Sequence, residues 1–426
     1  MLSVKPSLSQ ARKPRRGAIT VFVALMLIVI FAATALCIDI GWTTLTKSQL
    51  QTAADAAAAA GAGQLGENYA AYSTPRQPNK AGLIAQAIQD TDRYTGMYGS
   101  YNSAGGVKSL SILAGDMQVG FTDAHGNYQA SGYAGYPNTI TVVARRDASA
   151  NAPLPLFFAP LLGKKTQDLS ATASATIYTG LISGFDPNGG GVSTGGEFNG
   201  GGGGGWGGGY WSSGDGFDCG LLPVAFDVNT WTQFFSTGLS SDGTVHTDST
   251  GAAQIQIYPN PHNSPGNFGL LCIGAWTNAT PDYSNWILNG PSAGDLQALC
   301  DAGSFPVSLQ SPKPWKGSPG LRSTLGGDFA SIIGQPRLLP LFQPASVSPY
   351  QAASGNGSNT TYAIVGFVGV TVTEATGSGN NLTICVKPCD VTDPTAVFDP
   401  STVYPVGAEP SSQFPSFTHP VPKFTR

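Results

Sequence analysis

Charged side chains are scarce in this chain. Asp, Glu, Lys and Arg make up 11% of its 426 residues, against about 25% in an average soluble domain. Hydrophobic residues still reach 41%, enough to form globular cores, and 56 glycines and many uncharged polar residues fill much of the remainder. Such a polar but weakly charged surface is common in exported and cell-surface proteins and argues against a typical cytosolic enzyme.

Histidine is also rare, and common catalytic signatures are missing. The four histidines are widely separated, at His125, His246, His262 and His419. The chain has no Gly-x-Ser-x-Gly segment, the local sign of one class of serine hydrolase, and no His-Glu-x-x-His zinc helix. The sequence therefore predicts no catalytic residue, no cofactor, no metal site and no small-molecule substrate. A secreted hydrolase is a rival that an activity screen would eliminate.

Acidic residues are absent from the first 38 positions. Five of the 21 basic residues lie there, so the chain from Asp39 onward carries a formal net charge of −9. Binding to nucleic acid needs a basic surface that neutralises phosphates. We therefore predict no nucleic-acid partner.

The first long feature that is present is an apolar run. Ala18 to Ile38 is 21 residues without a charge, and a helix of this length spans the roughly 30 Å hydrocarbon layer of a membrane. Arg15 and Arg16 precede it, so the positive-inside rule keeps residues 1–17 cytoplasmic and translocates the chain from Asp39 onward. A cleaved signal peptide is the alternative, but its apolar core would be shorter.

The helix is expected to continue beyond the membrane. Leucines and alanines recur at helical spacing between Leu45 and Ala58, and alanine has the highest helix propensity. Gly61 and Gly63 are plausible stops, so we predict one element over residues 18–65. Its small residues would let another helix approach closely, although a stiff stalk without a partner would have the same sequence.

This segment resembles the N-terminal signature of the TadG-like proteins of the Tad (Flp) pilus system. The resemblance lies in Arg15-Arg16-Gly17, the apolar run, Asp39-Ile40-Gly41 and the block LQTAADAAA from Leu50 to Ala58. It covers roughly 50 residues strongly. The signature positions are Asp39, Gly41, Leu50, Gln51, Ala53, Ala54 and Asp55.

One position departs from the related pseudopilins of the same system. They are cut after a glycine and carry a glutamate five residues later, which their subunits use in polymerisation. Phe22 occupies that place after Gly17. The resemblance therefore implies an anchored accessory protein rather than a polymerising pilin.

The chain between the anchor and residue 180 reads as a small α+β domain. Lys80 to Tyr94 has an apolar helical face, and alternating segments predict strands at 107–113, 117–122, 139–144 and 169–179. Residues 66–180 form the predicted membrane-proximal domain. The Gly-rich stretch at 181–216 follows as a flexible linker.

Residues 217–390 read as a mostly-β domain, and residues 391–426 as an extended tail rich in Pro, Ser and Thr. Strands are predicted at 222–228, 254–258, 268–273, 337–342, 362–373 and 381–386, the last two as a hairpin. Short helices are expected at 284–288 and 293–300, the second capped by Ser292 with Asp295 at the third helical position.

Cysteines are missing between the apolar run and this second domain. Cys37 lies in the run, and the other five are Cys219, Cys272, Cys300, Cys385 and Cys389. The clustering favours disulfides in an oxidising compartment, with at least one cysteine left over. A zinc site at Cys385 and Cys389 is the rival, but no second close pair or nearby histidine completes it.

These observations predict an α+β protein with a long N-terminal transmembrane helix, a membrane-proximal α+β domain, a Gly-rich linker and a mostly-β domain. The resemblance implies a non-enzymatic, single-pass protein of the bacterial cytoplasmic (inner) membrane, with other pilus-assembly or envelope proteins as partners. The alternative is a membrane-tethered adhesion or carbohydrate-binding module. Its candidate stacking platforms are Trp231, Trp276, Trp286 and Trp315.

Overall fold

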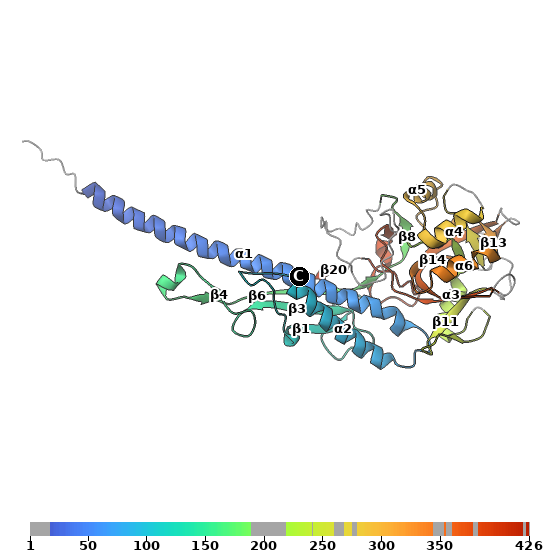
Figure 1. Cartoon of the computed structure of the whole chain (residues 1–426), viewed down its shortest axis with the longest axis horizontal. Helices are drawn as coiled ribbons and strands as arrows, with labels where there is room; N and C mark the ends of the chain where they lie inside the picture. Colours follow the sequence, from blue (N-terminus) through green and yellow to red (C-terminus); the bar gives the residue numbers. More distant parts are fainter. Residues whose placement is uncertain are drawn as a thin grey trace, which may run out of the picture.

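A computed structural model describes residues 18–188, 219–240, 242–259, 268–274, 279–343, 353–354, 360–377, 382–420 and 423–425. The basic segment 1–17 and most of the predicted Gly-rich linker lie outside these residues. One long helix projects from the folded part, which has two lobes (Figure 1). The α+β class and the long apolar N-terminal helix predicted from the sequence are confirmed.

Helix α1 (Ala18–Ser73) runs without interruption for 56 residues. The expected stops at Gly61 and Gly63 are wrong, because both glycines lie inside the helix. The helix ends one residue before Thr74, which precedes Pro75. A residue before proline is disfavoured in the helical conformation, so the proline sets the end of the helix.

The membrane-proximal lobe consists of two helices on an antiparallel sheet. Helix α2 (Lys80–Ser100) begins at Asn79, whose side chain accepts a hydrogen bond from the Gly82 amide. It packs along the C-terminal half of α1, and α1 also lies on strands β3 and β6. The strand order is β2-β1-β3-β6-β20, formed by β2 (Tyr128–Gln129), β1 (Met117–Thr122), β3 (Thr139–Arg146), β6 (Leu169–Thr176) and β20 (Lys423–Thr425).

A small hairpin projects from this lobe. It is formed by β4 (Leu154–Pro155) and β5 (Thr166–Gln167), and its loop holds the 3-10 turn η2 (Ala159–Leu162). Figure 1 shows the hairpin lying beside α1 and reaching back toward its N-terminal end.

The second lobe is organised around a mixed nine-stranded sheet. Its path is β10-β11-β17-β16-β13-β12-β9-β14, and β14 pairs again with β16. The pairings β16–β13, β13–β12, β12–β9, β9–β14 and β14–β16 therefore close a ring. The strands are β9 (Val224–Asp227), β10 (His246–Thr247), β11 (Ala253–Tyr258), β12 (Phe268–Leu271), β13 (Lys313–Pro319), β14 (Pro336–Phe342), β15 (Ala353–Ser354), β16 (Thr360–Thr376) and β17 (Thr383–Pro388).

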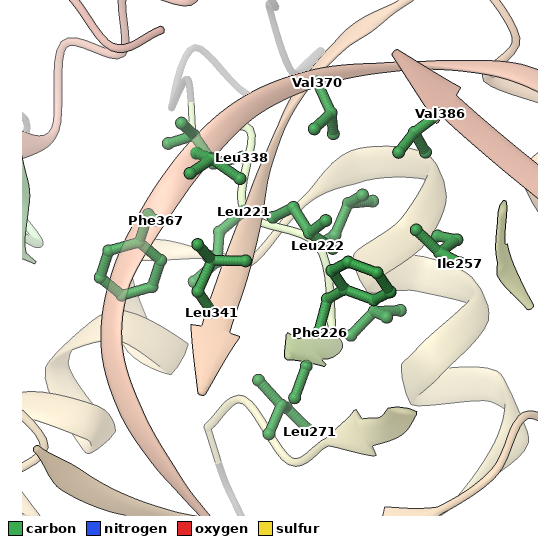
Figure 2. Close-up of a cluster of buried hydrophobic side chains, with 14 of the residues drawn as sticks. Leu221, Leu222, Phe226, Ile257, Leu271, Leu338, Leu341, Phe367, Val370 and Val386 are labelled. Carbon is green, nitrogen blue, oxygen red and sulfur yellow. The ribbon is translucent and has the colours of Figure 1, made fainter. Parts of the chain in front are cut away.

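Apolar side chains fill this ring and its surroundings. Leu222, Phe226, Leu341 and Val370 are fully buried and lie close together (Figure 2). Burial of such side chains is the main source of folding free energy. Helices flank the sheet and add apolar residues to the core: α3 (Val228–Thr237), α4 (Thr280–Asn289), α5 (Ala293–Asp301) and α6 (Gly326–Ser331).

The expected tail at 391–426 is folded in its described part. Three short strands of this segment return to the first half of the chain: β18 (Ala396–Phe398) pairs with β8 (Ile182–Phe185), β19 (Tyr404–Pro405) with β7 (Tyr178–Thr179), and β20 with β6. Phe414, Phe417 and His419 are buried. The prediction of an extended tail was wrong because a few apolar residues among prolines find partners that are far away in the sequence.

Local sequence patterns predicted several other elements correctly. Strands β1, β11 and β14, the β16–β17 hairpin and the Ser292–Asp295 capping box are confirmed. The expected strand at 107–113 is absent. Helix α3 and strand β13 were not predicted, because Trp, Phe and Thr in α3 and two prolines in β13 oppose the propensities of their elements.

Candidate functional site

The N-terminal part of α1 exposes a continuous apolar surface. Every residue from Thr20 to Thr34 is exposed, and Phe22 retains 59% of its accessible surface. Among the described residues, α1 is the one helix that is long and apolar enough to cross a membrane. Arg15, Arg16 and Gly17, predicted to set its topology, lie outside the described residues.

Asp39 marks the point where α1 meets the folded lobe. Its Oδ1 accepts a hydrogen bond from the Phe157 amide at 2.7 Å, and its Oδ2 accepts from the amides of Phe158 at 3.0 Å and Ala159 at 2.6 Å. The Trp42 ring lies 5.7 Å from the ring of Phe157. The first charged residue after the apolar run therefore holds the β4–β5 loop against the helix.

We expect Asp39→Asn to release this loop. Asparagine keeps one acceptor oxygen but loses the negative charge, and its amide group opposes the loop N–H donors. Amide hydrogen exchange in residues 153–165, followed by mass spectrometry, should be faster by roughly tenfold.

The matched control is Asp55→Asn, which removes another signature carboxylate from the same helix. Asp55 accepts a hydrogen bond from Gln51 and makes none with the loop. Unchanged exchange in 153–165 in the Asp39 variant would contradict the structural role assigned to Asp39.

The other signature residues attach α1 to the sheet. Leu50, Ala53 and Ala54 are fully buried. Gln51 donates hydrogen bonds to Asp55 at 2.8 Å and to the Thr172 carbonyl of β6 at 3.1 Å. Gly41 faces open space. The LQTAADAAA block is thus a packing surface. The expected close approach to another helix occurs within this chain, and the alternative of a stalk without a partner is wrong.

Gly61 is a point of close approach in this packing. A Cβ atom there would overlap Thr95 Oγ1 on α2 and approach Ile140 Cδ1 on β3 to 2.9 Å. Overpacking of a buried contact typically costs about 1–3 kcal/mol. This exceeds the gain of about 1 kcal/mol in helix propensity when alanine replaces glycine.

We therefore expect Gly61→Ala to lower the thermal unfolding midpoint and Gly61→Leu to disrupt the lobe. Gly66→Ala on the same helix is the control, because its Cβ would meet only Ile177 Cγ2 at 3.9 Å. That variant should be neutral or more stable, as measured by circular dichroism in detergent. A Gly61→Ala variant as stable as Gly66→Ala would refute the close packing.

The disulfide prediction is not supported. The structure contains no disulfide among the six cysteines, Cys37, Cys219, Cys272, Cys300, Cys385 and Cys389. Burial raises the pKa of Cys385 and of Cys389 to about 12, which keeps both thiols protonated at neutral pH. No group of three or more His, Cys, Asp or Glu side chains suited to a metal ion occurs in the described part of the chain.

The tryptophans proposed as carbohydrate platforms are core residues where they are described. Trp231 and Trp315 are fully buried, and Trp286 is 4% exposed. Their indole N–H groups donate to Pro415, Ser304 and Asp295 respectively. Trp276 lies outside the described residues. A ring without an accessible face cannot stack on a sugar, so this part of the alternative is wrong for these three residues.

A buried polar cluster joins the two lobes, and sequence reasoning missed it. Asp390 Oδ1 lies 2.6 Å from His419 Nε2, and its Oδ2 accepts from the Ala70 amide of α1 at 2.5 Å. His419 Nδ1 lies 2.9 Å from the Tyr178 carbonyl oxygen. The only sequence signal was a lone histidine in a segment of prolines and phenylalanines.

The N-terminal part of the chain matches a known family model. Residues 17–64 match the family described as "Putative Flp pilus-assembly TadE/G-like". This range covers the exposed apolar part of α1, Asp39 and the helix surface that packs in the membrane-proximal lobe. No curated protein and no solved structure matches the chain.

Proposed function

We propose that this chain is a single-pass, non-enzymatic cell-envelope protein that helps to assemble or anchor a pilus of the Tad (Flp) type. The family match at residues 17–64 carries the proposal. In this proposal the chain resides in the bacterial cytoplasmic membrane, with its basic N-terminus inside and the lobes outside. Its partners are other pilus-assembly or envelope proteins.

The proposed mechanism is mechanical. Helix α1 passes from its exposed apolar half into the membrane-proximal lobe as one continuous element. Its buried small residues and the Gln51 hydrogen bond to β6 fasten it to the sheet. A load on the lobe would therefore reach the membrane span directly.

The second lobe is also attached to helix α1. Asp390 binds the Ala70 amide near the end of α1, and strands β18, β19 and β20 pair with strands from the first half of the chain. These contacts favour a braced assembly over a β domain that reaches outward on a flexible linker. The Gly-rich segment and the predicted domain boundaries stay predictions.

The non-enzymatic, accessory role rests on two further observations. Phe22 is exposed on α1 at the position where related pseudopilins carry glutamate. The described histidines lie on separate elements: His125 in a turn, His246 on β10, and His419 in the junction, bonded to Asp390 and Tyr178. A structural use of His419 favours an architectural protein.

Deletion of the gene tests the assembly role. In a host that makes Flp pili, loss of this protein should abolish sheared surface pilin on immunoblots while total cellular pilin remains. Complementation with the intact chain should restore it, and complementation with the Gly61→Leu variant should not. Normal surface pilin in the deletion strain would overturn the proposal.

Topology can be measured separately. Epitope tags before Arg12 and after Arg426 should differ in protease access, with only the C-terminal tag cleaved in cells whose outer barrier is opened. The N-terminal tag should be lost only after the cytoplasmic membrane is permeabilised. Absence of the N-terminal tag from the mature chain would show cleavage and refute the retained anchor.

A further inference from the structure

The loop between β4 and β5 presents four large apolar side chains to solvent within six residues. Leu161 and Leu162 retain 85% and 86% of their accessible surface, Phe157 retains 62%, and Phe158 retains 39%. Soluble surfaces rarely concentrate apolar side chains in this way unless they contact a partner or a membrane. The surface of the loop is therefore suited to contact with an apolar environment.

The position of the β4–β5 loop relative to α1 indicates that this apolar environment is the membrane. Asp39, the first charged residue after the uncharged stretch 18–38, binds the amides of Phe157, Phe158 and Ala159. A helix of 21 residues covers the hydrocarbon thickness, so Asp39 lies where α1 leaves the bilayer. From that level the hairpin extends back toward the N-terminal end of α1, along the apolar part of the helix (Figure 1).

Seven backbone amides of the loop have hydrogen-bond partners within the protein. The amides of Phe157, Phe158 and Ala159 donate to Asp39, and those of residues 156, 161, 163 and 164 donate to carbonyls within the hairpin at 3.0–3.1 Å. Residue 160 is proline and has no N–H. In the hydrocarbon region each backbone polar group needs a partner within the protein, and these seven amides have one.

The polar flank of the loop matches a lipid headgroup layer. Lys164 and Lys165 follow the apolar tip directly and are exposed, and long basic side chains at the edge of a membrane extend toward headgroup phosphates. Trp42 on α1 packs against Phe157 at the same level, and tryptophan is enriched at membrane interfaces.

We propose that the β4–β5 loop inserts Phe157, Leu161 and Leu162 into the outer leaflet beside α1, as a second membrane contact that fixes the tilt and rotation of the lobe. The inference rests on the proposed anchoring of α1. The occupant is the lipid bilayer itself, continuous with the lipid around the span. A helix that spans alone could rotate and tilt, whereas two separated contacts restrict both motions.

Photocrosslinking of the full-length chain in nanodiscs of phosphatidylethanolamine and phosphatidylglycerol tests this proposal. The photoreactive residue p-benzoylphenylalanine is placed singly at Leu161, at Ile28 in the span, or at Ile333, an exposed aliphatic residue of the second lobe. Intact-mass spectrometry then measures adducts carrying one phospholipid. We expect the Leu161 variant to form at least ten times more lipid adduct than the Ile333 variant.

The three positions separate the possible failures. Lipid adducts at 28 with none above background at 161 would overturn the loop proposal and leave the anchor intact. An absence of adducts at both 28 and 161 would overturn both proposals. A protein–protein adduct at 161 in place of a lipid adduct would identify the patch as an interface with a second copy and also contradict membrane insertion.

Discussion

Replacement of Asp390 by alanine is expected to lower the free energy of unfolding by about 3–5 kcal/mol, because removal of one partner leaves a buried group uncompensated. Asp390 is 4% exposed and His419 is 7% exposed. The substitution would deprive His419 Nε2 of its partner and also free the Ala70 amide. Urea unfolding in detergent, followed by tryptophan fluorescence, measures the loss.

A second Asp–His pair provides the matched control. Asp242 Oδ2 lies 2.8 Å from His246 Nε2, but both side chains are partly exposed. Exposed pairs contribute about 0–1 kcal/mol, so Asp242→Ala should change stability little. Equal losses in the Asp390 and Asp242 variants would show that the junction does not depend on the buried pair.

The buried Asp390–His419 pair also predicts a pH dependence of stability. Burial alone would lower the pKa of His419, but the Asp390 carboxylate outweighs burial and holds that pKa above its ordinary value of 6.5. A raised folded-state pKa means that the stabilisation is complete below pH 6.5 and is lost as the pH rises through the folded value. Asp390→Asn should flatten this alkaline decline, and an unchanged slope would contradict the assignment.

Replacement of Trp315 by alanine is expected to lower the free energy of unfolding about as much as Asp390→Ala does, for a different reason. The side chain is 1% exposed, and its ring lies 5.5 Å from Phe305 and 5.9 Å from Phe367. Replacement of a buried aromatic residue by alanine typically costs about 3–5 kcal/mol, through lost burial and the cavity left behind. We expect Trp315→Ala to lower the urea midpoint and to weaken the near-ultraviolet circular dichroism.

Trp315→Phe is the control for the ring itself. Phenylalanine keeps most of the packing and loses the hydrogen bond from the indole N–H to the Ser304 carbonyl at 3.2 Å. Its cost should be smaller, about 1–2 kcal/mol. A Trp315→Ala protein as stable as the wild type would return Trp315 to consideration as an accessible binding platform.

Part of the proposed site was predictable because its signals are local. The apolar run, the small-residue block and Asp39 lie within one helix, where a spacing of three or four residues places side chains on one face. The identity of these residues therefore indicated a span followed by a packing surface. The partner of Asp39 could not be found in this way, because Phe157 is 118 positions away.

Other failures also arose from contacts that are remote in the sequence. The prolines of residues 391–426 predict an extended tail, yet His419 bonds to Asp390 and Phe414 approaches the Gly366 position of β16. The clustering of the cysteines predicts disulfides, but disulfide formation depends on distance and direction in space. Composition carries neither kind of information.

The sequence by itself determined the uncharged span, the helix that continues it, the α+β class and the family resemblance, because these depend on composition and on periodicities of a few residues. Only the tertiary structure decided that the Ala-rich face is covered by α2 and the sheet, that Asp39 holds an apolar loop, and that Asp390 and His419 join the lobes. Each of these features needs two chain segments brought together by the burial of apolar surface, and no single segment encodes its partner.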